Sequence, residues 1–203
     1  MTEPAELSAD LQHEEAKSLA DRLGWHHKHE EHDLASQWSG VPFGYGEHQK
    51  VHNVLRKNHA GRDVTAFDYR FVIFSDKDVD SSDRQAIHRY LVVVLPLATP
   101  VPALSASEGR YSHWEPVGSR LNVDHERFGD HYDVYGEDQA FADAVLDGEW
   151  MDKVLKRMRR TEWRFTGNEL IGWHRDQHVA HELESVLDVL CPLADKAERV
   201  ARS

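Results

Sequence analysis

The feature that most restricts the fold is an apolar run from Tyr90 to Leu104, YLVVVLPLATPVPAL. Its first half carries consecutive β-branched residues, which favour a strand. Pro96, Pro100 and Pro102 exclude a helix through the second half. The run is also shorter than the roughly 20 residues that a membrane-spanning helix needs. It therefore predicts a buried central strand with its exit loop, and no direct membrane insertion.

Two pairs of segments flank turn residues and predict antiparallel hairpins. Residues 50–57 and 62–74 are separated by Asn-His-Ala-Gly, which suits a tight turn. Residues 161–165 and 169–173 flank Thr-Gly-Asn in the same way. Together with the central strand, these hairpins indicate a mainly antiparallel sheet.

Helical spacing of apolar residues marks the two ends of the chain and one internal stretch. An N-terminal helix is expected within residues 1–24. Inserted helices are expected over 138–159, interrupted at Asp147 and Gly148. The last helix is expected over 176–200.

Two residues of this last helix carry specific expectations. Asp176 suits the N-cap position, where a carboxylate accepts hydrogen bonds from free backbone N–H groups. Pro192 lies inside the helical pattern and should kink the helix or break it into two pieces.

These elements predict an α+β fold, a mainly antiparallel sheet with helices packed on one face and with N- and C-terminal helices. We expect a single domain over 1–203, in which the sheet and its inserted helices occupy 25–174.

The charge balance narrows the classes of partner. The chain has 24 Lys and Arg against 36 Asp and Glu, a net charge of −12, which repels phosphate backbones. We expect no nucleic-acid partner. The first residues are acidic where a secretory signal is basic and then apolar, and Cys191 has no second cysteine for an internal disulfide. The expected location is the cytoplasm.

Two histidine-rich stretches raise the hypothesis of a metal site for zinc or another divalent metal. Residues 26–32 read HHKHEEH. As a strand, they place His27 and His29 on one face; as a helix, they pair histidines three positions apart. His178 and His181 form a second pair near the start of the last helix. The alternative for the first stretch is a solvent-facing edge strand that polar side chains protect from pairing with other chains.

An aromatic, glycine-rich loop is a further candidate for binding. WSGVPFGYG contains Trp38, Phe43 and Tyr45, and aromatic side chains of this kind are enriched in interfaces and pockets. The alternative is that these rings anchor the loop to the core.

Several segments, in their order, resemble a group of uncharacterised actinobacterial proteins. They are WSGVPFG, NVLRKNHAGRDVTAFDYRF, LVVVLPLATPVPAL, ERFGDHYDVYGEDQAFADAVLDGEWMDKVL and ELIGWH. The likeness is strongest at residues 38–44 and 61–69. Because the group has no assigned activity, the resemblance implies kinship but no catalytic residue. It also implies a strand of mixed polar residues at 26–32, which makes the histidine run a local surface variation.

No complete catalytic motif occurs, so the leading hypothesis is a non-catalytic binding or protein-interaction domain rather than an enzyme. No cofactor is expected. Its partner is an unidentified protein, and a homodimer is compatible with this role. The competing hypothesis is a metal-dependent hydrolase or metal-binding protein that uses His27 and His29, with His178 or His181.

Overall fold

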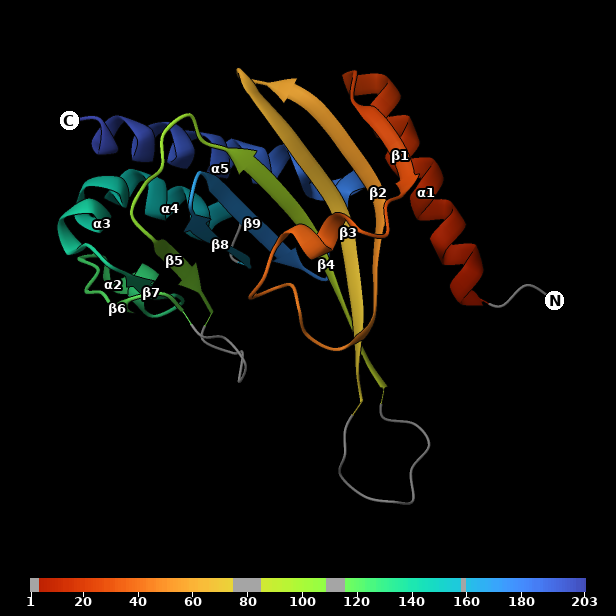
Figure 1. Ribbon diagram of the computed structural model, residues 1–203, viewed down its shortest axis with the longest axis horizontal. Coiled ribbons are helices and arrows are strands. Elements are labelled where there is room, and N and C mark those ends of the chain that lie inside the picture. The colour runs from red at the N-terminus through yellow and green to blue at the C-terminus, as the bar shows by residue number, and fades with distance from the viewer. Residues whose placement is uncertain (1–3, 75–84, 109–115, 158–159) are drawn as a thin grey trace.

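An antiparallel β-sheet forms the centre of the structure (Figure 1). The computed structural model describes residues 4–74, 85–108, 116–157 and 160–203. Within these ranges, one nine-stranded sheet has the order β1-β2-β3-β4-β9-β8-β5-β7-β6. The strands are β1 (His26–Glu30), β2 (Glu47–His59), β3 (Arg62–Phe74), β4 (Gln85–Pro96), β5 (Leu104–Ser107), β6 (Ser119–Arg120), β7 (Asp133–Gly136), β8 (Thr161–Thr166) and β9 (Glu169–Arg175).

The apolar run predicted as a central strand forms most of β4. This strand lies between β3 and β9, and Val92 pairs with Phe67 on one side and Trp173 on the other. Both predicted hairpins also form. Ala60 and Gly61 join β2 to β3 with φ values of 51° and 81°, the left-handed conformation that tight hairpin turns require.

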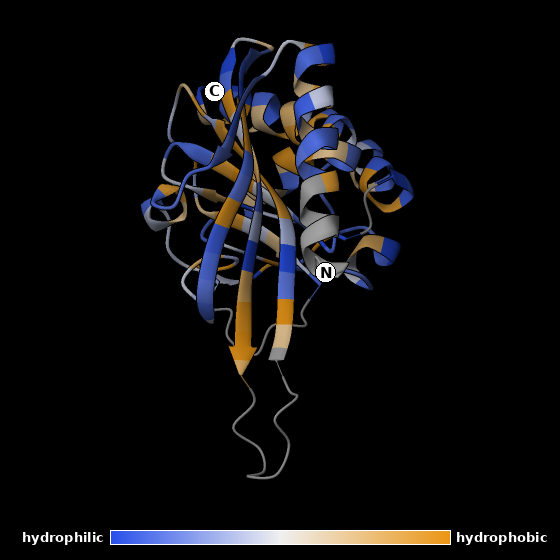
Figure 2. Cartoon of the chain, turned by 90° about the vertical axis from the view of Figure 1, so that its right-hand side faces the viewer, coloured by the Kyte–Doolittle hydropathy of each residue, from blue (hydrophilic) through white to orange (hydrophobic). Residues whose placement is uncertain are grey.

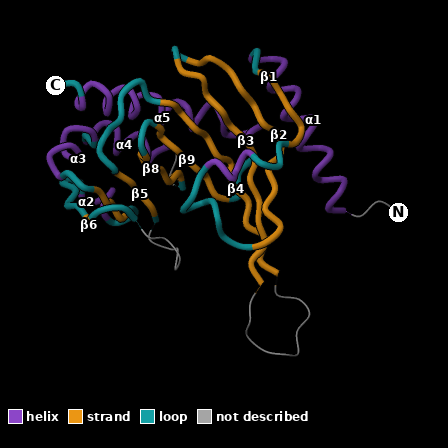
Figure 3. Tube along the Cα trace, viewed as in Figure 1, coloured by secondary structure: helices purple, strands orange, loops and turns teal. Residues whose placement is uncertain are grey.

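The α-helices pack on one face of this sheet (Figure 3). They are α1 (Pro4–Leu23), α2 (Glu126–Gly129), α3 (Gln139–Val145), α4 (Gly148–Arg157) and α5 (Val179–Ala201). Their buried side chains share one core with Val64, Leu91 and Val93 of the sheet. None of the described helices is both long and apolar enough to cross a membrane.

The other face of the sheet is covered by an irregular segment that begins with the 3₁₀ helix η1 (Leu34–Gln37). In this second core, Phe43 packs with Phe67 and Trp173. The predicted α+β fold with helices on one face is therefore confirmed.

The predicted interruption of the inserted helices is found at Asp147, between α3 and α4. The Asp147 Oδ1 atom accepts a hydrogen bond from the backbone N–H of Trp150 at 2.7 Å. This side chain therefore caps the first turn of α4.

The C-terminal helix α5 differs from its prediction in two respects. It begins at Val179 rather than Asp176, and it continues through Pro192 as one helix. Proline lacks the N–H that would bond to the carbonyl of Asp188. Instead, Lys153 Nζ on α4 donates to this carbonyl at 2.6 Å. Of the two predicted alternatives, the break is wrong: a neighbouring helix supplies the missing donor, and the proline ring itself is exposed. A kink at Pro192 stays a prediction.

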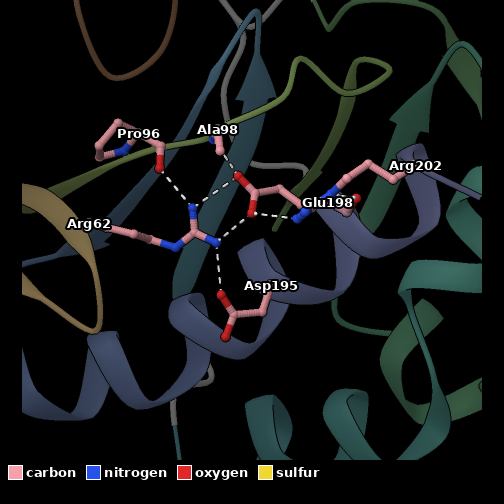
Figure 4. Close-up of polar contacts among 6 residues, drawn as sticks. All are labelled: Arg62, Pro96, Ala98, Asp195, Glu198 and Arg202. Carbon is pink, nitrogen blue, oxygen red and sulfur yellow. Dashed lines mark hydrogen bonds and ion pairs between the residues drawn. The ribbon is translucent and has the colours of Figure 1, made fainter.

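A buried ion pair connects the start of β3 to α5 (Figure 4). Nη1 and Nη2 of Arg62 donate to the two carboxylate oxygens of Glu198 at 3.1 and 2.8 Å. The guanidinium also donates to Asp195 Oδ1 at 2.8 Å and to the carbonyl of Pro96 at 2.9 Å, and Glu198 accepts from the Ala98 N–H. The Arg62 and Glu198 side chains are 10% and 5% exposed. The guanidinium lowers the pKa of Glu198 below its usual value.

Candidate functional site

A pocket of about 510 Å³ lies where the helices stop covering the sheet. Alternate residues of β3 face the helical side, and Ala66 of this row is in the helix-covered core. The next members of the row, Asp68 and Arg70, line the pocket together with Ile87 and Arg89 of β4. The other lining residues come from α1, from strands β1 to β4 and from the segment before α5: Gln12, His29, Glu30, His52, Asn53, Tyr69, Tyr90, Asp176 and His178.

Asp68 is the polar centre of this pocket. Its Oδ2 accepts a hydrogen bond from Asn53 Nδ2 at 2.9 Å, and its Oδ1 accepts from the Val179 N–H at 2.7 Å. Burial raises the pKa of Asp68 to about 6, although both hydrogen bonds favour the ionised form. Both oxygens therefore have protein donors, and Asp68 caps the first turn of α5 from a neighbouring strand. The expected cap, Asp176, has a φ of 57° and does not occupy the N-cap position, which is held by His178.

Asn53 reaches Asp68 from an irregular point in β2. The register of β2 against β3 shifts between His52 and Leu55, which is the mark of a β-bulge. Within this bulge Asn53 has a φ of 52°, a left-handed conformation that asparagine tolerates better than most residues. The bulge thus turns the Asn53 side chain, which is buried, toward the pocket.

Four histidines gather between α1 and the edge of the sheet, and we call them the histidine cluster: His13, His27, His29 and His52. The Nδ1 atoms of His13 and His29 are 2.8 Å apart, and His13 Nδ1 is 3.3 Å from Asn53 Oδ1. The ring centroids of His13 and His27 are 5.1 Å apart, and those of His29 and His52 are 6.3 Å apart. Burial lowers the pKa of His27 and of His52, so these two rings favour the neutral state.

The histidines predicted as metal ligands separate into different surroundings. His27 and His29 lie on β1 and belong to the histidine cluster, and β1 is an edge strand of the sheet as the alternative interpretation expected. His178 lines the pocket, with its Nε2 3.0 Å from Gln12 Nε2. His181 is 54% exposed and forms an ion pair with Glu15 at 3.1 Å. Across the described part of the chain, no three His, Cys, Asp or Glu side chains are arranged to hold a metal ion.

The aromatic loop residues lie on the opposite face of the sheet from the pocket. Phe43 is fully buried, and Trp38 stacks on Phe43 and Phe67 at centroid distances of 5.3 and 5.9 Å. Trp38 Nε1 also donates to Glu169 Oε2 at 2.8 Å. Phe43 therefore has no surface to offer a partner, whereas Trp38 and Tyr45 are partly exposed and a binding role for them stays a prediction.

Sequence reasoning missed Asp68, Asn53 and His52, which line the pocket, and His13 of the adjoining histidine cluster. One signal was available, because Asp68 interrupts the apolar alternation of TAFDYRF at a position that faces the core. The other three positions gain their meaning only from contacts between distant segments.

Comparisons with known proteins give a fold relationship. No protein-family model matches the chain. A search of curated proteins also finds no match. Among solved structures, the crystal structure of the mycobacterial trehalose monomycolate transport factor A, TtfA, is similar, with a TM-score of 0.64 and 14% identity. The match covers 91% of this chain and 93% of that one. At this identity the similarity shows that the two chains share a fold, over nearly their whole lengths.

Proposed function

We propose that this protein is a non-catalytic binding domain whose ligand occupies the pocket around Asp68. The observation that supports this most is the composition of the pocket wall, which combines imidazole, amide, carboxylate and guanidinium groups from separate parts of the chain. A volume of about 510 Å³ is within the range of small-molecule sites. Several convergent polar groups on a preformed wall fix the orientation of a polar ligand.

The internal bonds of the pocket favour binding over catalysis. Asp68 has the raised pKa that often marks a catalytic acid or base. However, both of its oxygens are held by Asn53 and the Val179 N–H, and His178 Nδ1 is 3.9 Å from Oδ1, beyond hydrogen-bond distance. The carboxylate therefore has a structural task that accounts for its burial.

The similar solved structure, that of a transport factor, is compatible with this proposal. We further propose that the present protein acts in the cytoplasm with a protein partner or as a homodimer. The partly exposed apolar side chains Phe74 and Ile87, at 43% and 45%, support such a contact.

The proposal is tested by blocking the pocket. Ile87→Trp places a large ring at its rim, and Val117→Trp makes a matched change at another exposed apolar residue, 58% exposed, away from the pocket. Saturation-transfer NMR with a panel of sugars, amino acids and phosphorylated metabolites should find ligands that bind the unmodified protein and Val117→Trp but not Ile87→Trp. If every observed ligand binds all three proteins equally, the pocket is not the binding site.

A further inference from the structure

Three basic side chains form a row across β2, β3 and β4. Lys50 pairs directly with Arg70, and Arg70 pairs directly with Arg89. Side chains of directly opposed residues in antiparallel strands share one face and have Cβ atoms about 4.5–5.5 Å apart. We call these three residues the cationic row. It crosses the open end of the helical face of the sheet, and Arg70 and Arg89 line the pocket.

The charges of Lys50 and Arg70 act on a histidine that lines the pocket. His52 is two residues from Lys50 on β2, so both side chains project from the same face. Burial lowers the pKa of His52 first, and the charges of Arg70 and Lys50 lower it further, while Glu30 raises it and His29 lowers it. The charges of Arg70 and Lys50 therefore act on a side chain that lines the pocket.

The acidic groups beside the row are already paired. Glu30 contacts His52 at 3.2 Å and His32 at 3.6 Å. Asp176 contacts Arg175 at 3.7 Å, and Asp68 has the two hydrogen bonds described above. Among the described residues, Lys50, Arg70 and Arg89 form no ion pair within 4.0 Å.

Three like charges in direct opposition destabilise the ligand-free sheet. The chain has many acidic side chains that could neutralise the row, since it carries 36 acidic residues and a net charge of −12. An anionic ligand would offset this repulsion by occupying the space between the guanidinium groups. Arginine binds phosphoryl oxygens through two parallel N–H donors, and a doubly charged phosphate monoester matches several cations better than a single carboxylate does.

We infer that the cationic row binds the phosphoryl group of the pocket's ligand, with Arg70 and Arg89 as its main donors and Lys50 as a flanking charge. This inference rests on the proposed binding function and adds the chemical class of the ligand. The phosphoryl group belongs either to a soluble metabolite or to the headgroup of an anionic lipid, which share this recognition chemistry.

The test measures binding of defined probes to four proteins. They are the unmodified chain, Arg70→Gln, Arg89→Gln and the control Arg127→Gln, which removes one positive charge from an exposed site on α2 remote from the pocket. Isothermal titration calorimetry uses inorganic phosphate and glucose 6-phosphate. Flotation uses phosphatidylcholine vesicles with and without phosphatidic acid.

Arg70→Gln and Arg89→Gln should each lower the affinity for the phosphorylated probe about tenfold or more, while Arg127→Gln should leave that affinity unchanged. Binding to the soluble probes identifies a metabolite, and binding confined to the phosphatidic acid vesicles identifies a lipid headgroup. Arg70→Gln should also raise the melting temperature of the ligand-free protein, because it removes like-charge repulsion. A purely structural arginine would give the opposite thermal result.

The inference and the proposed function fail in different ways. If no phosphorylated probe binds, or if Arg127→Gln weakens binding as much as the pocket variants do, the cationic row is not a phosphoryl site. A different ligand that Ile87→Trp excludes would in that case still support the binding pocket. If Ile87→Trp retains the phosphorylated probe at full affinity, the pocket assignment fails even where the arginines contribute.

Discussion

The ion pair between Arg62 and Glu198 allows a quantitative test of how β3 is held to α5. Arg62→Met retains most of the apolar stem but leaves the 5% exposed Glu198 carboxylate without the guanidinium. Removing one member of a buried ion pair costs about 3–5 kcal/mol, since the remaining charge stays buried. The Ala98 N–H and Arg202, whose Nη2 lies 3.4 Å from Glu198 Oε2, still contact the carboxylate. We therefore expect the lower part of this range, about 3 kcal/mol.

The same loss should be visible in thermal and chemical unfolding. For a chain of this size, each 1 kcal/mol shifts the melting temperature by about 2–4 °C, so Arg62→Met should lower it by about 6–12 °C. Urea unfolding at pH 7, followed by circular dichroism, gives the free energy directly. The pKa of Glu198 is lowered from a usual 4.5, so the pair stabilises the fold above that pH and loses its contribution as the pH falls through the lowered pKa. The loss in the free energy of unfolding caused by Arg62→Met should therefore become smaller in acid.

A double-mutant cycle decides whether the pair itself is responsible. Arg62→Met with Glu198→Met removes both charges together. It should cost no more than Arg62→Met alone, although the Pro96 carbonyl and the Ala98 N–H lose a partner. A coupling energy of about 2 kcal/mol is expected. Free energies that add within about 0.5 kcal/mol would refute the reasoning, because they would show that neither charge depends on the other.

Three further predictions concern other contacts of the fold. Burial lowers the pKa of His174 from 6.5 to about 4, so the unfolded chain binds more protons in that window and stability falls by up to about 3 kcal/mol as the pH drops through it. His174→Gln should flatten this fall in urea unfolding curves from pH 7 to 4, and an unchanged slope would contradict the assignment. Lys153→Met removes the donor to the Asp188 carbonyl and should cost about 1 kcal/mol, whereas an equal loss for Lys156→Met would show a general charge effect. A Cβ at Gly172 would lie 2.3 Å from Leu190 Cδ1, so Gly172→Val should cost about 1–3 kcal/mol by thermal denaturation, and an unchanged midpoint would show that Leu190 moves aside freely.

The sequence was most informative where local patterns decide local structure. The apolar run around Val92 predicted the central strand, and the turn residues within 58–61 and at Gly167 predicted two hairpins that form. These signals work because strand pairing across a tight turn involves residues close in the chain. The resemblance to actinobacterial proteins stays a prediction.

The pocket was not predictable because its walls come from segments as distant as Gln12 and His178. Helix capping by Asp68 is equally non-local, since a carboxylate on β3 bonds to an N–H that is 111 residues further along the chain. The donor that Pro192 lacks is supplied to the Asp188 carbonyl by Lys153, which lies in another helix. Propensity describes each residue with its sequence neighbours and does not include donors or acceptors that tertiary packing supplies.

The cap that Asp68 provides has a consequence for how the chain can be cut and rejoined. The first turn of α5 takes its acceptor from β3, so a fragment that carries only the last helix lacks the group that defines where this helix starts. In such a fragment the first turn should fray, with rapid amide hydrogen exchange at Val179. In a circular permutant whose new ends lie between β9 and α5, the first turn of α5 would form only after β3 has taken its place in the sheet. The beginning of α5 is thus a property of the assembled sheet.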